Sequence, residues 1–183
     1  MKIQFHIISL LFIGILMNLV FGQTGAVPYG QVIESLSFKS DILGKGVFYS
    51  IYLPPDYDIS KRSYPVVYLL HGGGGNETHW VQMCEANVTA DRLIAERKIP
   101  AMILVMPAAG RTRYINDHKG ESRYENMFIQ ELMPHIDKNY RTRKGQGEFT
   151  DKKFRAVSGF SMGGYGSLML ALHHTDKFIA CVA

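Results

Sequence analysis

The chain has 183 residues, of which 46% are hydrophobic and 20% are charged, and its net charge is +4. A chain of this length and apolar content can form one hydrophobic core of ordinary size, which excludes a mostly disordered protein and an array of several domains. The small basic excess is typical of a solvated surface. Because aromatic residues are not interleaved with the basic ones, we expect no nucleic-acid partner.

The first segment, residues 1–22, has the pattern of a secretory signal peptide. Lys2 stands in a short amino-terminal region, and an apolar stretch follows from Ile7 to Phe21. This stretch is shorter than the roughly 20 apolar residues that a membrane-spanning helix needs. We therefore expect export to a secreted or periplasmic location, a mature domain over residues 23–183 and no stable membrane anchor. A retained anchor is the second interpretation.

Beyond this segment, alternating strand and helix patterns predict one α/β domain with a mostly parallel sheet and flanking helices. Two strands, 32–38 and 47–53, are expected to form an amino-terminal antiparallel hairpin. Apolar runs typical of buried strands and amphipathic segments typical of helices follow. The expected buried strands are 65–70, 101–106, 154–157 and 178–183, and the expected helices are 88–98, 122–139 and 167–174. Pro134 should kink or tighten the second of these helices.

One stretch, Gly159-Phe160-Ser161-Met162-Gly163, contains the pattern Gly-x-Ser-x-Gly between an expected strand and an expected helix. A serine at a sharp strand-to-helix turn is exposed as a nucleophile, and glycines on either side let the two elements cross closely. The pattern alone arises often by chance, so the strand and helix around it are what favour this interpretation. We predict that Ser161 is the catalytic nucleophile and that Gly159 and Gly163 support the turn.

The first buried strand ends at His71, and four glycines, Gly72 to Gly75, follow. A phosphate-binding loop is excluded because no Lys-Ser/Thr pair follows these glycines. Amides that side chains do not cover can stabilise the negative charge that develops during ester cleavage, so we assign the oxyanion hole to the amides of Met162 and Gly73. His71 and Gly72 are expected to support this loop. A mobile turn is the alternative interpretation of the glycines.

The histidines show no metal-binding pattern. His71 and His79 are not at a helical metal-ligand spacing, and the sequence has no His-Glu-x-x-His motif, so we predict neither a metal nor a cofactor. His79 and the later histidines are interpreted as surface or structural residues. Trp80 is expected to pack the glycine loop against the body of the domain. Cys84 and Cys181 are interpreted as buried thiols and not as a bridge.

Four motifs occur in order along the chain: YLPPDY (52–57), YPVVYLLHGGGGNETHW (64–80), ELMPHID (131–137) and GFSMGG (159–164). Together they resemble the esterase D family of α/β-hydrolases, which includes feruloyl and acetylxylan esterases, over residues 31–183. The resemblance implies an α/β-hydrolase fold and a serine carboxylic-ester hydrolase that acts through an acyl-enzyme. Its substrates would be small esters or acylated and feruloylated polysaccharide. The oligomeric state is not indicated.

In that family the catalytic acid and histidine follow later strands, and no position of this sequence corresponds to them. The resemblance therefore implies a chain that lacks about the last third of the fold and that has little or no turnover by itself. An acyltransferase similar to the mycolyltransferases is a second interpretation. A serine peptidase of the same fold is a third, although no gating domain precedes the motif. A catalytically incomplete fragment or pseudoenzyme is the non-enzymatic alternative.

Overall fold

A mixed sheet lies at the centre of the computed structural model, which describes residues 29–145 and 151–183. The sheet order is β1-β2-β4-β3-β5-β6. The strands are β1 (Gln31–Ser40), β2 (Lys45–Leu53), β3 (Val66–Leu70), β4 (Ile103–Pro107), β5 (Arg155–Gly159) and β6 (Ala180–Val182). β2 is antiparallel to both β1 and β4, whereas β4, β3, β5 and β6 are parallel. This confirms the predicted parallel sheet with an antiparallel hairpin. The predicted signal peptide lies outside the described residues.

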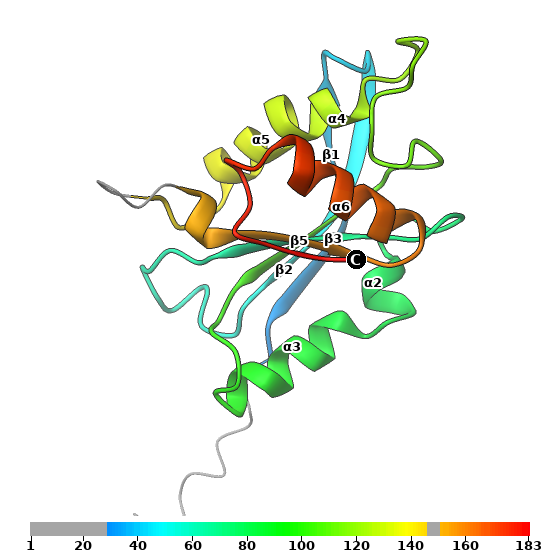
Figure 1. Ribbon diagram of the computed structural model, residues 1–183. Helices are drawn as coiled ribbons and strands as arrows, with labels where there is room; N and C mark the ends of the chain where they lie inside the picture. Colours follow the sequence, from blue (N-terminus) through cyan, green and yellow to red (C-terminus); the bar gives the residue numbers. More distant parts are fainter. Residues whose placement is uncertain (1–28, 146–150) are drawn as a thin grey trace, which may run out of the picture.

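Helices cover both faces of this sheet (Figure 1). They are α2 (His79–Gln82), α3 (Ala86–Ala95), α4 (Tyr124–Met127), the π-helical η1 (Phe128–Leu132), α5 (Met133–Asn139), the 3-10 helix η2 (Asp151–Phe154) and α6 (Met162–His173). Figure 1 shows α2 and α3 on one face and α4, α5 and α6 on the other. The predicted helices are present, but α6 begins earlier than expected, directly after Ser161.

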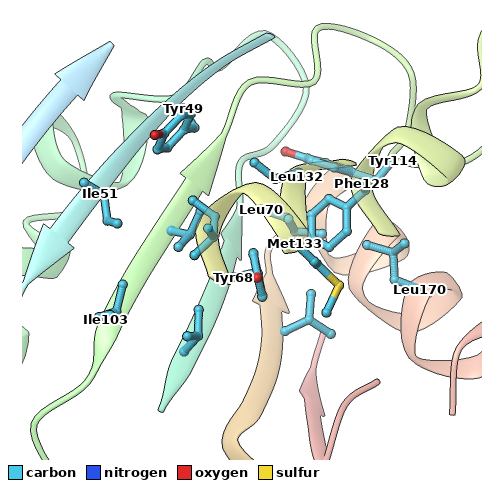
Figure 2. Close-up of a cluster of buried hydrophobic side chains, with 14 of the residues drawn as sticks. Tyr49, Ile51, Tyr68, Leu70, Ile103, Tyr114, Phe128, Leu132, Met133 and Leu170 are labelled. Atoms are coloured by element: carbon cyan, nitrogen blue, oxygen red, sulfur yellow. The ribbon is translucent and has the colours of Figure 1, made fainter. Parts of the chain in front are cut away.

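The two faces of β3 show how these layers pack. Val66, Tyr68 and Leu70 are buried in the main hydrophobic cluster with side chains of the α4–α6 layer (Figure 2). Val67 and Leu69 pack in a smaller cluster, together with residues of α2 and α3. Successive residues of a strand point to opposite faces, so an apolar strand without polar positions is covered on both faces. The continuous apolar run in the sequence therefore indicates a central strand.

The helix around Pro134 differs from the prediction. Residues 128–132, which precede this proline, form a π-helical segment between α4 and α5. Proline has no N–H to donate to the carbonyl four residues earlier, and its ring needs room at that carbonyl. A π-helical turn is wider than an α-helical turn and provides this room. The helix therefore widens before Pro134, so of the two predicted effects the tightening is wrong, whereas the kink stays a prediction.

The last strand is also different from the expectation. β6 pairs with β5 through residues 180–182 and forms an edge of the described sheet. Val182 and the preceding Ile179 are 65% and 56% exposed. Cys181 is half-buried, whereas Cys84 is exposed, so the prediction of a buried thiol is wrong for Cys84. Cys84 lies in the turn after α2, at the surface of the part of the chain that the structure describes.

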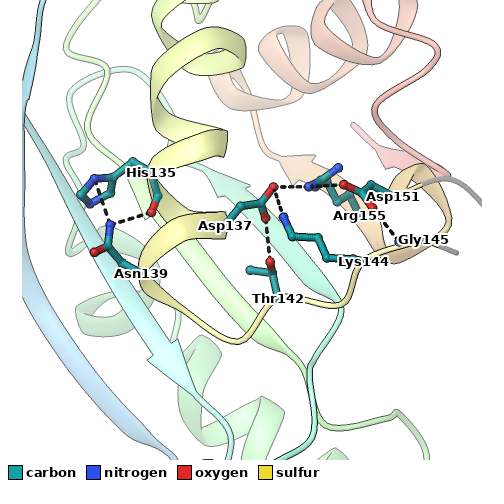
Figure 3. Close-up of polar contacts among 8 residues, drawn as sticks. All are labelled: His135, Asp137, Asn139, Thr142, Lys144, Gly145, Asp151 and Arg155. Carbon is teal, nitrogen blue, oxygen red and sulfur yellow. Dashed lines mark hydrogen bonds and ion pairs between the residues drawn. The ribbon is translucent and has the colours of Figure 1, made fainter.

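Ion pairs hold the beginning of β5 in place (Figure 3). Arg155, the first residue of β5, pairs with Asp137 of α5 and with Asp151 of η2. Asp137 also accepts a hydrogen bond from the Thr142 hydroxyl and pairs with Lys144, both at 2.7 Å. Because the Arg155 side chain is buried, removal of both acidic partners would leave an uncompensated buried charge. The network thus anchors the strand whose other end carries the Gly-x-Ser-x-Gly motif.

Candidate active site

Ser161 lies in the turn between β5 and α6 with φ 53° and ψ −119°, a conformation that residues other than glycine rarely adopt. Such backbone strain at a strand-to-helix turn is typical of a nucleophile elbow. The side chain is exposed, and its hydroxyl forms no hydrogen bond with another residue in the described part of the chain. Backbone bonds close the turn: the Gly163 amide donates to Phe160 (2.9 Å) and the Tyr165 amide to Ser161 (3.0 Å).

The two outer glycines of the motif lie where β5, α6 and β3 approach one another most closely. A Cβ atom on Gly159 would lie 2.4 Å from the carbonyl carbon of Gly163. A Cβ atom on Gly163 would lie 2.1 Å from the carbonyl oxygen of Leu70, at the end of β3. Both neighbours are backbone atoms, which cannot rotate away as a side chain can. The elbow therefore has room for hydrogen only at these two positions.

His71 connects the glycine loop to the segment after β4. Its ring is buried; Nδ1–H donates to the Gly72 carbonyl (2.8 Å), and Nε2 accepts from the Ala109 amide (3.1 Å). The Tyr114 hydroxyl donates to the His71 carbonyl at 3.0 Å. This pattern requires the neutral ring with its proton on Nδ1, because an amide can donate only to a free lone pair. The Nε2 lone pair is therefore not available to act as a base.

The burial of the His71 ring predicts that the stability of the fold depends on pH. Burial lowers the pKa of His71, as it does for His135. The unfolded chain takes up a proton near pH 6.5, whereas the folded protein does so only at a lower pH. The stability contributed by the neutral ring is therefore present above about pH 6.5 and is lost as the pH falls from there toward the folded pKa, by up to about 1.4 kcal/mol per pH unit.

Urea unfolding at pH 7.5 and pH 5.5 measures this effect. The wild-type free energy of unfolding should fall more between these two pH values than that of His71→Gln, whatever the stability of the variant at pH 7.5. His118→Gln, in an exposed loop, is the control and should keep the wild-type pH dependence. Equal pH dependence in His71→Gln and the wild type would show that burial of the His71 ring does not cause the fall in the free energy of unfolding.

The two amides assigned to the oxyanion hole belong to segments that meet. Met162 is the first residue of α6, where an amide has no acceptor within the helix. Gly73 is exposed, a Cβ atom there would have no neighbour within 4 Å, and its amide has no acceptor among the described residues. The segments touch where Gly72 approaches the Phe160 ring, at 2.6 Å from a Cβ atom placed on the glycine. This arrangement is compatible with one anion site, and the assignment stays a prediction.

An aromatic cluster beside Ser161 is not evident in the sequence. The Phe160 ring lies 5.6 Å from that of His79 and 5.3 Å from that of Trp80, between ring centroids. Trp80 therefore contacts the elbow itself. His79, which is interpreted from the sequence as a surface or structural residue, packs against Gly75 and Phe160 beside Ser161. Its place in the 64–80 motif is the one sequence signal for this role.

The remaining histidines lie on other elements. His173 and His174 at the end of α6 share one carboxylate oxygen of Glu125, at 2.9 and 2.8 Å. His135 contacts the Tyr49 hydroxyl. In residues 29–145 and 151–183, no group of three or more His, Cys, Asp or Glu side chains could hold a metal ion. No helix in these two ranges has the length and apolar content needed to cross a membrane.

Comparison with known sequences gives a consistent family. The family described as "Putative esterase" matches residues 40–183. The chain is 38% identical over 157 residues to an endo-1,4-beta-xylanase/feruloyl esterase of Xylanibacter ruminicola, covering 80% of this chain and 20% of that protein. It is 32% identical over 147 residues to an esterase of Mycobacterium tuberculosis, with 77% and 29% covered. The chain thus spans less than a third of the length of these relatives.

Solved structures give the same fold. A ferulic acid esterase superposes with a TM-score of 0.75 at 29% identity, covering 84% of this chain and 58% of that one. A ferulic acid esterase of Anaeromyces mucronatus, solved in complex with ferulic acid, gives a TM-score of 0.67 at 25% identity, with 85% and 57% covered. The mixed sheet with helices on both faces is an α/β-hydrolase fold.

Proposed function

Because the chain belongs to the Esterase family, we propose that it carries the nucleophile of a serine carboxylic-ester hydrolase. The proposed substrates are acyl or feruloyl esters of polysaccharide, and the proposed location is outside the cytoplasm, reached through residues 1–22. The observation that carries the proposal is the strained, exposed Ser161 between β5 and α6. The names of two similar proteins, a xylanase/feruloyl esterase and an esterase with bound ferulic acid, support the substrate class.

In the proposed reaction, Ser161 Oγ attacks the ester carbonyl carbon and the carbonyl electron pair moves onto oxygen. The amides of Met162 and Gly73 donate hydrogen bonds to this oxyanion. When the carbonyl re-forms, the bond to the alcohol breaks, the alcohol leaves with a proton, and an acyl-enzyme remains. Water then attacks the acyl group, releases the acid and restores the Ser161 hydroxyl.

This reaction needs a base to accept the Ser161 proton. The Nε2 lone pair of His71 is occupied, and no histidine in the described ranges bonds to the Ser161 hydroxyl. The similar ferulic acid esterase is longer, since this chain covers 58% of it. We therefore assign the base and its orienting acid to residues outside these 183. The chain alone should then turn over substrate about a thousandfold more slowly than a complete enzyme, or still more slowly.

The test uses the natural protein that carries this sequence. It should release ferulic acid from methyl ferulate, and a fluorophosphonate probe should label one peptide, the one that contains Ser161. Residues 23–183 alone should show far lower turnover. Labelling of another residue, or full activity of residues 23–183, would contradict the assigned roles. A competing alcohol tests the alternative reaction, because predominant transfer to that alcohol instead of water would identify an acyltransferase.

A further inference from the structure

A cavity lies at the same edge of the sheet as Ser161, beside the end of β4. Its volume is about 550 Å³, and its walls come from the start of β2, the segment after β4 and the loop before α4. Figure 1 shows this loop near the turn that joins β1 and β2. β4, β3 and β5 are parallel neighbours, so their carboxyl ends lie at one edge, where open α/β sheets bind ligands. The cavity is therefore on the side of the candidate active site.

Hydrogen bonds join the floor of this cavity to the glycine loop. Ala109 lines the cavity, and its amide donates to His71 Nε2 at 3.1 Å. Tyr124 also lines the cavity and donates its hydroxyl to the Ala108 carbonyl at 2.8 Å. Tyr114 lies in the loop between β4 and α4, and its hydroxyl donates to the His71 carbonyl at 3.0 Å. One hydrogen-bonded frame thus positions both the cavity floor and the loop assigned to the oxyanion hole.

Two acidic side chains hold opposite sides of the cavity through several hydrogen bonds each. Glu131 accepts hydrogen bonds from the Ser40 hydroxyl (2.5 Å) and from the backbone amides of Asp41 and Ile42 (3.0 Å each). These bonds hold the β1–β2 turn. On the opposite side, the Asp117 carboxylate accepts from the amides of Lys119 (2.9 Å) and Glu121 (3.0 Å), which closes the loop before α4. These contacts preorganise the cavity without a ligand.

The charges that line the cavity are unequal. Lys45 and Arg111 contribute two cations and Glu121 one carboxylate. In the described part of the chain, neither cation pairs with a carboxylate. Phe48, which is 50% exposed, also lines the cavity. Two cations that pair with no described carboxylate, in a cavity that also has apolar lining residues, suit a ligand that has both an apolar face and a negative charge.

We propose that this cavity binds a uronate-bearing sugar in the polysaccharide portion of the ester substrate. A sugar ring presents a C–H face that can pack against apolar lining residues, and hydroxyl groups that polar lining residues can bind. Its carboxylate pairs with Arg111 and Lys45, Arg111 being able to bind both carboxylate oxygens. The inference rests on the proposed function, since it concerns the alcohol portion of the same substrate.

Binding without an ester tests this site separately from catalysis. Calorimetry on the natural protein with the Ser161→Ala change compares a xylotetraose that carries one glucuronic acid with unsubstituted xylotetraose. The acidic sugar should bind at least about 10-fold more tightly, because hydrogen bonds between charged groups contribute that much. The difference should shrink in 0.5 M salt, which screens charges. Equal affinity of the two sugars would overturn the proposal, whether or not the protein hydrolyses esters.

Amino-acid substitutions test whether the acidic sugar binds in this cavity. Arg111→Ala should weaken binding of the acidic sugar by about 10-fold and leave the neutral sugar unchanged, with Arg111→Lys intermediate. Lys119→Ala removes an equal charge from the same loop outside the cavity and is the matched control. Amide shifts in NMR spectra should appear at Gly46 and Gly110. An equal loss in Lys119→Ala would show a general charge effect, and shifts at Gly73 alone would place the sugar elsewhere; either result would overturn the proposal.

Discussion

Replacing Ser161 by alanine in the natural protein should lower kcat for methyl ferulate by roughly 10⁶-fold, with little change in KM. The hydroxyl forms the covalent bond to the acyl group, whereas the amides of Met162 and Gly73 remain in place. Alanine also lacks the hydroxyl whose oxygen displaces fluoride from a fluorophosphonate to form a phosphonate ester, so labelling should disappear. Progress curves with methyl ferulate and intact mass after labelling measure the two effects.

The control for this variant removes a hydroxyl close by. Ser158→Ala changes the same group on β5, three positions earlier, and should stay within about threefold of the wild-type activity. Near-ultraviolet circular dichroism should show the same fold in both variants. If Ser161→Ala kept a tenth of the wild-type activity, the nucleophile would have to be another residue, and the elbow would have only a structural role.

The positions of the strands and of the turn at Ser161 could be predicted because local patterns determine them. β3 is a continuous apolar run that ends at a glycine cluster, and the serine motif lies between a short strand pattern and a helix pattern. The α-helical repeat likewise indicated the helix around Pro134. The π-helical turn in that helix could not be predicted. It depends on how neighbouring residues accommodate the proline ring and the carbonyl that has lost its N–H donor.

The less predictable part of the site depends on contacts between residues far apart in the chain. Tyr114 lies in a loop at φ 65°, yet it is fully buried and bonds to the His71 carbonyl, 43 residues away. Its ring also explains Gly166, where a Cβ atom would lie 2.5 Å from that ring. Nothing in the sequence around Gly166 indicates that this glycine packs against the ring of Tyr114. The partner becomes visible only when α6 is packed on the loop before α4.

The largest expected loss of stability comes from a substitution at Gly163, where the backbone of the elbow approaches the end of β3 most closely. The methyl group of Gly163→Ala would lie 2.1 Å from the carbonyl oxygen of Leu70 and 2.8 Å from that of His71. Both oxygens belong to the end of a central strand, so relief requires α6 to move away from β3. We expect a loss of at least about 3 kcal/mol in the free energy of unfolding, or a fall of roughly 6–12 °C in Tm.

The next residue provides a matched control on the same helix. A Cβ atom on Gly164 would lie 3.4 Å from the carbonyl oxygen of Gly159, an ordinary contact distance. Gly164→Ala should therefore be neutral or slightly stabilising, since alanine favours a helix over glycine by up to about 1 kcal/mol. Urea and thermal unfolding of both variants measure the contrast. Equal stability of the two would mean that α6 can shift from β3 without cost, and the strained Ser161 turn would then have no rigid support.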